Sequence, residues 1–141
     1  MKKLLIAVLA TVITQQALAV NWIQVSEGIG DNKHYVDLDS IQADYLADGT
    51  PVITAWKQTE YKQAQVSFNG KKYWSDKSFY YYDCRARKFD IEYLVTYDKQ
   101  GNVVSNNNNS SFSRYSSTNW RRVIPGTNGE ITLNAVCAYA S

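Results

Sequence analysis

Few residues of this chain could carry out a reaction. His34 is the only histidine, and Cys84 and Cys137 are the only cysteines. A nucleophilic cysteine needs a lowered thiol pKa and an oriented base, and the residues beside either cysteine suggest neither. One histidine and two cysteines fall short of a structural zinc site, and the chain has no phosphate-binding glycine loop and no nucleophile-elbow motif. We therefore predict no enzyme, no metal site and no cofactor.

Two aspartates offer an alternative. Asp37 and Asp39 would lie on the same side of an extended chain, where they could bind a cation or act as the carboxylate pair of a hydrolase. Aspartates in this position more often cap the next turn of helix. We favour the cap, and we interpret His34 as a residue at the start of a strand.

The N-terminal segment indicates export. Two lysines precede an apolar run over residues 4–13, and a small-residue sequence ends at Ala19. This order is typical of a secretory signal peptide, and the run is too short to span about 30 Å of hydrocarbon. We predict cleavage after Ala19, a periplasmic or secreted and cell-surface location, and one domain over residues 20–141. Because no cysteine directly follows the run, we expect no lipoprotein. Because the sequence has no second apolar run long enough to cross a membrane, we expect no membrane-spanning chain.

Export also decides how the cysteines are interpreted. In an oxidising compartment, two cysteines in one small domain are expected to form a disulfide. Cys84 and Cys137 lie 53 positions apart. A crosslink that closes a loop of this length stabilises a domain by about 4 kcal/mol in the chain-entropy model. The alternative, a catalytic cysteine that uses His34 as its base, has no support in the sequence.

Most of the chain has the pattern of antiparallel strands joined by short turns. Asn69-Gly70 is the strongest hairpin signal. The run from Ser105 to Ser113 is rich in Asn and Ser, so we expect a mobile loop there. Strands are expected at 22–25, 33–38, 51–61, 66–68, 72–74, 78–89, 90–98, 103–104 and 120–124.

The C-terminal residues predict a helix. Thr127 and Glu130 have the spacing of a capping box. One helical stripe follows at Leu133, Val136, Cys137 and Ala140, and a second apolar side at Ile131, Ala135 and Tyr139 predicts a well-covered helix. The fold class is therefore α+β: an antiparallel sheet of about six strands in a meander, with the C-terminal helix packed on one face.

The disulfide would tie this helix to the 78–89 strand. Strand alternation places Tyr80, Tyr82, Cys84 and Ala86 on the face under the helix. The opposite face would carry Phe79, Tyr81, Asp83, Arg85 and Arg87. That face, together with Phe89, would need cover from a partner or from a second copy in a homodimer.

The feature that points to binding is the aromatic and basic stretch from Lys71 to Phe89. It holds six basic and two acidic residues. The mature chain around it is neutral, because removing the two signal-peptide lysines from 15 basic residues leaves 13 against 13 acidic ones. Tyr, Trp and Arg are favoured at protein interfaces. The candidate partner-binding residues are Lys71, Lys72, Tyr73, Trp74, Lys77, Tyr81, Arg85, Arg87 and Lys88.

Two other interpretations of this stretch stay open. Its aromatic side chains could form the core while its charges form a solvated face. Basic and aromatic residues together also suit single-stranded nucleic acid. Export and the neutral charge of the mature chain argue against a nucleic-acid partner.

Several segments resemble the surface-adhesin E family. They are Trp22-Ile23, residues 34–41, 82–87, 97–104 and 120–127, followed by Cys137. The resemblance implies an exported domain with an antiparallel sheet, a C-terminal helix and a Cys–Cys link. It also implies dimers and binding of host extracellular proteins of the laminin, vitronectin or plasminogen class. A second hypothesis is a periplasmic inhibitor or accessory factor of an envelope enzyme such as lysozyme.

Overall fold

The computed structural model describes residues 20–28 and 31–141, so the predicted signal peptide lies outside the described residues. None of the helices in this part of the chain has the length and apolar character needed to cross a bilayer. The elements are β1 (Trp22–Glu27), β2 (Lys33–Asp37), η1 (Leu38–Ser40), β3 (Gln42–Tyr45), β4 (Pro51–Val66), β5 (Lys72–Asp83), β6 (Lys88–Tyr97), β7 (Val103–Asn108), β8 (Arg121–Arg122) and α1 (Asn128–Tyr139).

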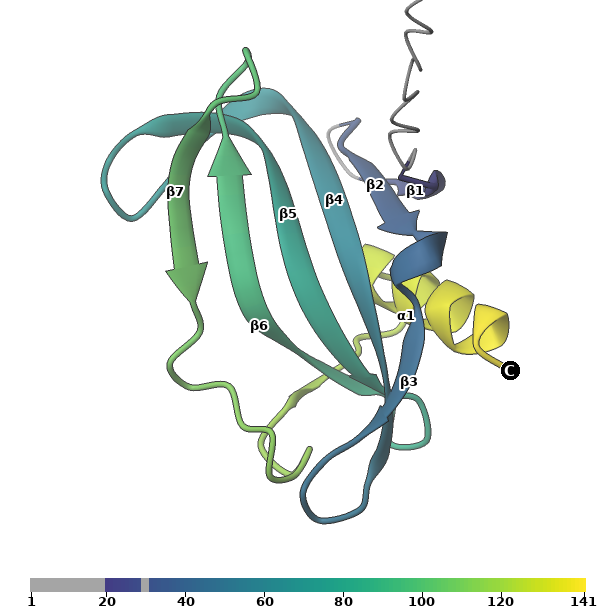
Figure 1. Ribbon diagram of the computed structural model, residues 1–141. Coiled ribbons are helices and arrows are strands. Elements are labelled where there is room, and N and C mark those ends of the chain that lie inside the picture. Colours follow the sequence, from purple (N-terminus) through teal and green to yellow (C-terminus); the bar gives the residue numbers. More distant parts are fainter. Residues whose placement is uncertain (1–19, 29–30) are drawn as a thin grey trace, which may run out of the picture.

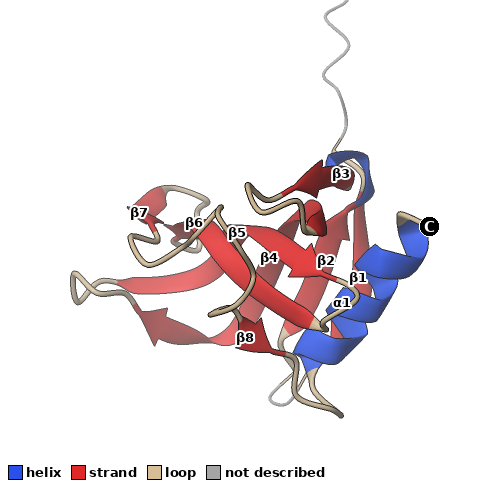
Figure 2. Ribbon diagram, turned by 90° about the horizontal axis from the view of Figure 1, so that it is seen from below, coloured by secondary structure: helices blue, strands red, loops and turns tan. Residues whose placement is uncertain are grey.

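The strands form one antiparallel sheet in the order β1-β2-β4-β5-β6-β7. The short strands β3 and β8 pair with β4 and β6. Figure 1 shows that the sheet is strongly curved, and Figure 2 shows α1 lying beside β1 and β2 on one face. The predicted α+β architecture with one C-terminal helix is confirmed, and the meander holds from β4 to β7.

Strands β2 and β3 share one edge of β4, and a cap makes the bend between them. The Asp37 side chain accepts a hydrogen bond from the Asp39 N–H at 3.2 Å, so the interpretation of this aspartate as a cap is confirmed. The Ser40 hydroxyl donates to the Asp37 carbonyl at 2.7 Å and accepts from the Trp56 N–H at 2.8 Å. The cap therefore also satisfies a donor of β4 where strand pairing is interrupted.

The first core lies between the sheet and α1. It contains Val36, Ala55, Tyr82, Leu133 and Val136, all almost completely buried. The predicted packing of Tyr82 under the helix is confirmed. The second apolar side of the helix is exposed, contrary to prediction: Ile131 is 45% and Tyr139 57% accessible, because the helix contacts the sheet along one stripe only.

The Cys84–Cys137 disulfide closes this core. The S–S distance is 2.02 Å and the two Cα atoms are 5.9 Å apart. The bond joins the residue after β5 to the last turns of α1. The predicted disulfide is therefore present, and it excludes Cys84 as a free nucleophile.

A second core covers the opposite face of the sheet. Leu46, Val52, Tyr81 and Trp120 form it, and Phe79 and Phe112 pack against it. Trp120 and Phe112 belong to the segment over residues 109–120, which crosses this face. The expectation that Phe79 and Tyr81 need an external partner is wrong, because this segment covers them. The argument for a homodimer that forms through this face therefore no longer applies.

The predicted end of the 78–89 strand was wrong. The strand ends at Asp83, and a turn over residues 84–87 follows, so Ala86 is exposed and does not lie under the helix. The Asp83 carboxylate accepts the Ala86 N–H at 2.9 Å and the Ser117 hydroxyl at 2.6 Å, which fixes that turn. Because the turn resets the strand alternation, Phe89 packs against the first core, 5.8 Å from Tyr80, rather than beside Tyr81.

Part of the predicted mobile loop is the edge strand β7. Residues 105–108, which extend the strand that begins with Val103, pair with β6 although their side chains are polar. The Ser105 hydroxyl lies 2.7 Å from that of Thr96, so side-chain hydrogen bonding adds to the backbone ladder. An edge strand of polar residues shows no alternation of apolar side chains in its sequence. Its backbone pairing with the neighbouring strand holds it in the sheet.

Candidate functional site

The predicted binding residues lie at two ends of β5. Lys71 and Lys72 stand at the β4–β5 turn, whereas Arg85 and Arg87 stand in the β5–β6 turn (Figure 1). A strand of this length separates the two groups by about 40 Å along the chain. We call the first end, residues 66–74 and 97–104, the distal end, and the turn over residues 84–87 the proximal end. The stretch therefore does not form one continuous surface.

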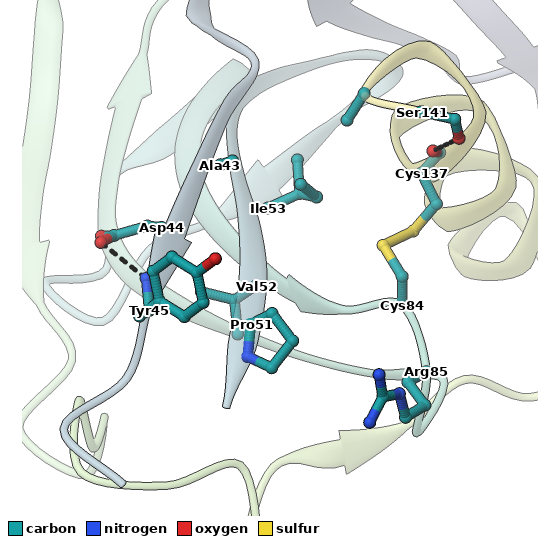
Figure 3. A pocket seen from close by; sticks show the side chains of 11 residues that line it. Ala43, Asp44, Tyr45, Pro51, Val52, Ile53, Cys84, Arg85, Cys137 and Ser141 are labelled. Carbon is teal, nitrogen blue, oxygen red and sulfur yellow. Dashed lines mark hydrogen bonds between the residues drawn. A yellow bond between two sulfur atoms is a disulfide. The ribbon is translucent and has the colours of Figure 1, made fainter. Parts of the chain in front are cut away.

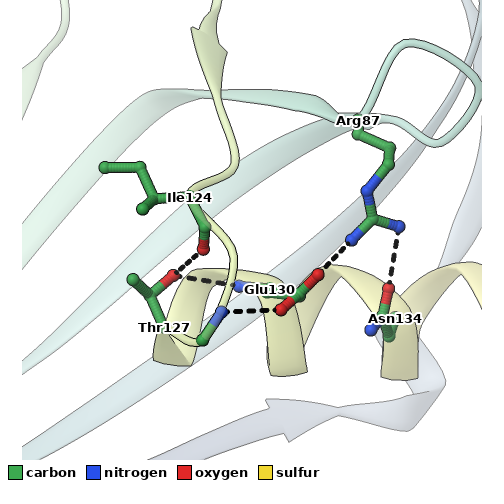
Figure 4. A network of polar contacts seen from close by, with 6 residues as sticks. Arg87, Ile124, Thr127, Glu130 and Asn134 are labelled. Carbon is green, nitrogen blue, oxygen red and sulfur yellow. Dashed lines mark hydrogen bonds and ion pairs between the residues drawn. The ribbon is translucent and has the colours of Figure 1, made fainter.

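Arg87 at the proximal end holds the helix. Its guanidinium donates to the Glu130 carboxylate at 2.8 Å and to the Asn134 side chain at 3.1 Å (Figure 4). Arg87 also adopts a positive φ of 53°, which sets the direction of its turn. These bonds link the turn after β5 to the first half of α1.

The same network caps α1. The Thr127 hydroxyl accepts from the Glu130 N–H at 3.4 Å and donates to the Ile124 carbonyl at 2.7 Å (Figure 4). The Glu130 carboxylate accepts from the Gly126 N–H at 2.8 Å. The predicted capping box is confirmed in its Thr127 half, while Glu130 reaches one residue further back than the motif requires.

Two further predicted residues are also used within the fold. The Lys88 ammonium donates to the carbonyls of Ser117 at 3.1 Å and Thr118 at 2.9 Å, which anchors the 109–120 segment. Tyr81 is only 2% accessible. Its ring lies 4.8 Å from that of Phe112 and therefore belongs to the second core rather than to a binding surface.

Arg85, which makes no ion pair with the described residues, is exposed at the proximal end and lines a cleft. This cleft has a volume of about 300 Å³ and lies between β3, the start of β4 and the end of α1 (Figure 3). Its walls include Tyr45, Pro51, Arg85 and the Cys84–Cys137 disulfide. The walls are mostly apolar, and the side chains around the cleft contain no nucleophile paired with a base.

The distal end combines exposed apolar and basic side chains. Val66, Phe68 and Val103 are 66%, 79% and 58% accessible, although large apolar side chains are usually buried. The Asn69 side-chain amide donates to the Val104 carbonyl at 3.3 Å, so the β4–β5 and β6–β7 turns lie side by side. The exposed cations of this end are Lys71, Lys72 and Lys99.

Aromatic rings extend this surface along the sheet. The Lys99 ammonium lies 4.9 Å from the centre of the Trp74 ring. Lys77 lies 5.6 Å from the centres of both the Tyr97 and the Trp22 rings. Tyr73, on the other side of the strand, packs edge-on against Tyr61 at 5.6 Å. The structure thus brings together five of the predicted residues: Lys71, Lys72, Tyr73, Trp74 and Lys77.

Sequence reasoning missed four residues of the distal end: Val66, Phe68, Val103 and Lys99. The exposure of Phe68 could have been predicted from its place beside the Asn69-Gly70 turn, because an aromatic side chain at a hairpin turn cannot reach the core. Val103 and Lys99 join the surface only through the pairing of β6 with β7 and the contact between the two turns. The sequence predicted the meander of the 90–98 and 103–104 strands, whereas the contact between the two turns has no sequence signature.

A buried carboxylate lies behind the distal end. Asp76 accepts hydrogen bonds from the Tyr61 hydroxyl at 2.5 Å and from the Ser78 hydroxyl at 3.3 Å. Burial raises the pKa of Asp76, and these bonds together with the charge of Lys57 oppose the increase. Burial also raises the pKa of Tyr61. This network joins β4 to β5.

His34 links the sheet to the start of α1. Its Nε2 lies 3.2 Å from the Asn128 side-chain amide, and its Nδ1 lies 3.4 Å from the Thr59 hydroxyl. Burial, with the nearby charge of Lys57, lowers the pKa of His34 to about 4. The residue lies in β2, as expected, and its contact with the helix was not predicted.

Comparison with known proteins agrees with this architecture. The family model for surface-adhesin protein E matches residues 22–138. The solved structure of Haemophilus influenzae protein E has a similar fold, with a TM-score of 0.55, 14% sequence identity and coverage of 84% of each chain. No curated protein matches the chain by sequence. The family model spans both strands of the first hairpin, the whole sheet and almost all of α1, and on this basis the chain belongs to the surface-adhesin protein E family.

Proposed function

We propose that this chain is a non-enzymatic, adhesin-like domain, exported by cleavage after Ala19, that binds an extracellular protein through its distal end. The partner class that we propose is host extracellular protein, such as laminin, vitronectin or plasminogen. Membership of the surface-adhesin protein E family supports a role in binding. The exposed apolar and basic side chains of the distal end support its location.

The observation that carries the proposal is the exposure of Phe68 among lysines. Burying one such aromatic side chain in an interface is worth about 1.5–3 kcal/mol. Lys71, Lys72 and Lys99, which are exposed in the two turns of the same end, add positive charge to this surface. The acid in this region, Asp98, accepts hydrogen bonds from the N–H groups of Gln100 and Asn102. The partner surface that fits is an apolar pocket beside acidic side chains.

The proximal end is a weaker candidate because two of the three predicted cations there, Arg87 and Lys88, are already engaged, which leaves only Arg85. Arg87 pairs with Glu130, and Lys88 donates to two backbone carbonyls. A partner that bound there would have to displace these contacts. The distal lysines make no ion pair with the described residues, so a partner can use them at lower cost.

The test is a binding comparison between matched triple variants. The distal variant carries Phe68→Ser, Lys71→Glu and Lys72→Glu. The control carries Tyr115→Ser, Lys33→Glu and Arg122→Glu, which removes one exposed aromatic side chain and reverses two exposed cations elsewhere. Surface plasmon resonance against laminin, vitronectin and plasminogen at physiological salt should show about a tenfold or larger loss for the distal variant only. Equal binding by both variants would remove the distal end from the interface.

Location is tested separately. Protease treatment of intact cells should degrade the mature chain if the chain is displayed or released. Full protection in intact cells, with degradation after the outer membrane is opened, would place the chain in the periplasm. That result would favour an accessory factor of an envelope enzyme over an adhesin.

A further inference from the structure

A cavity of about 210 Å³ lies between the sheet and the first two turns of α1. It is separate from the distal end and from the cleft in Figure 3. Its walls come from β4, β5, β6 and α1. The lining residues are Lys57, Tyr80, Tyr82, Phe89, Gly129 and Thr132.

The cation in this wall lacks a direct ionic contact, although the Asp76 carboxylate lies close enough to act on it. Lys57 is partly buried, and its ammonium forms no ion pair and no hydrogen bond with the residues that the structure describes. Its nearest aromatic contact is the Tyr80 ring, whose centre lies 5.4 Å away. Burial lowers the pKa of Lys57, and the negative charge of Asp76 only partly opposes this effect. A desolvated cation that no carboxylate contacts directly is unfavourable, so an anion in direct contact with the Lys57 ammonium would stabilise it.

Other groups around the cavity also favour negative charge. The helix α1 has twelve residues, and its positive end lies at this wall through Gly129. A Cβ atom added to Gly129 would meet only the Thr127 hydroxyl, at 3.5 Å, so the backbone is open to a ligand. Arg121 is close enough to Tyr80 to act on it electrostatically.

The tyrosines of the wall hold unused polar atoms. The Tyr82 hydroxyl is buried and has no hydrogen-bond partner in the described part of the chain. The Tyr80 hydroxyl makes no hydrogen bond with those residues either. The two rings stack on each other, with their centres 5.5 Å apart, and Phe89 lies beside Tyr80. The cavity thus offers a cation at one side and aromatic surface at the other.

Size and charge define the ligand. A volume of 210 Å³ corresponds to about seven water molecules at about 30 Å³ each and is smaller than most drug-sized pockets. One lysine, with Asp76 nearby, suits a single negative charge better than a phosphate dianion. We propose that this cavity binds a small monocarboxylate with an aromatic or aliphatic body, with the carboxylate on the Lys57 ammonium and the body against Tyr80 and Phe89. A free organic acid and the C-terminal carboxylate of a peptide share this chemistry.

The test is an NMR titration of the ¹⁵N-labelled protein, purified after export, with 3-phenylpropionate and with its neutral amide. The acid should produce saturable shifts at Gly129 and Thr132 and bind at least about tenfold more tightly than the amide, because only the acid can pair with Lys57. A short peptide that ends in phenylalanine, titrated beside the free acid, distinguishes the two sources of the carboxylate. Absent or scattered shifts in both titrations, or equal affinity for acid and amide, would overturn the proposal.

Two variants test whether the Lys57 ammonium is the group that the carboxylate contacts. Lys57→Met keeps an apolar stem but removes the ammonium, so it should abolish the preference for acid over amide. Lys33→Met, which changes an exposed lysine on the neighbouring strand β2, should keep that preference. A Lys57→Met protein that still prefers the acid would contradict the assignment. If that variant fails to fold, the comparison of acid and amide on the unchanged protein decides the question by itself.

Discussion

At the scale of single residues, His34 shows how a reactive residue type is used for packing. Asn128 donates its side-chain amide to the ring Nε2, and Nδ1 lies beside the Thr59 hydroxyl. This arrangement suits a neutral imidazole that carries its proton on Nδ1. Protonation would add a donor where the Asn128 amide already donates, in a site that the charge of Lys57 also makes unfavourable for a cation.

We predict that acid weakens the fold through His34. Its pKa is about 4 in the folded chain against 6.5 for the unperturbed group. Between these values the unfolded chain binds more protons, so the free energy of unfolding should decrease as the pH falls from 6.5 towards 4, by at most about 3 kcal/mol. Urea unfolding of the protein and of His34→Gln across this range measures the difference. The variant should show a flatter pH dependence, and identical slopes would refute the role of His34.

At the scale of elements, the disulfide fastens α1 to one face of the sheet, and the 109–120 segment covers the other face. Cys137 attaches the last turns of α1 to the residue after β5. On the other face, the Trp120 indole N–H donates to the Ser113 carbonyl at 3.2 Å, which closes the segment on itself over Tyr81. Each of these two features leads to a testable prediction.

Removing the disulfide should cost about 4 kcal/mol of unfolding free energy, because the unfolded chain regains the freedom of a long loop. The variant is Cys84→Ala with Cys137→Ala, measured by urea unfolding beside the oxidised protein. A single free thiol is avoided because it could form dimers. A loss smaller than about 1 kcal/mol would mean that core packing alone holds α1.

Trp120→Ala should uncover the second face. The loss of a buried tryptophan costs about 3–5 kcal/mol, and the cover over Tyr81 and Phe112 is removed. We expect increased binding of a hydrophobic dye and faster amide exchange in residues 109–120. Tyr115→Ala, which removes an exposed side chain of the same segment, is the matched control. Unchanged dye binding by Trp120→Ala would show that the segment does not shield this face.

The elements differ in how far the sequence predicts them. Apolar periods located the strands around Val52 and Val95 and the stripe of α1 at Leu133 and Val136, because burial determines those residues. The strand β7 has no such period and is held by pairing with β6. The cover by Trp120 depends on a contact between segments about 40 positions apart, which local patterns do not encode.

The candidate site was predictable only in part, for the same reason. Composition identified Lys71, Lys72 and Trp74, since clustered basic and aromatic residues are visible in the sequence. It also included Arg87 and Lys88, whose partners Glu130 and Ser117 come from distant parts of the chain. Which cations are free for a partner therefore depends on the tertiary contacts.

At the scale of the whole molecule, the proposed binding surface lies apart from the disulfide. The disulfide, α1 and the capping network lie at the proximal end of β5, whereas the exposed side chains of Val66, Phe68 and Val103 lie at the distal end. The likeness to Haemophilus influenzae protein E, at 14% identity, concerns the fold. The partner of this chain must therefore be identified from its own surface.

The most direct test of this account is site-specific photo-crosslinking. A benzophenone amino acid is placed at position 68 in one protein and at position 139 in another, and each protein is irradiated with laminin, vitronectin or plasminogen. Both native side chains are exposed, but Phe68 lies at the distal end and Tyr139 at the end of α1. We predict a crosslinked complex from position 68 and none from position 139; the reverse pattern, or equal yields from the two positions, would contradict the account.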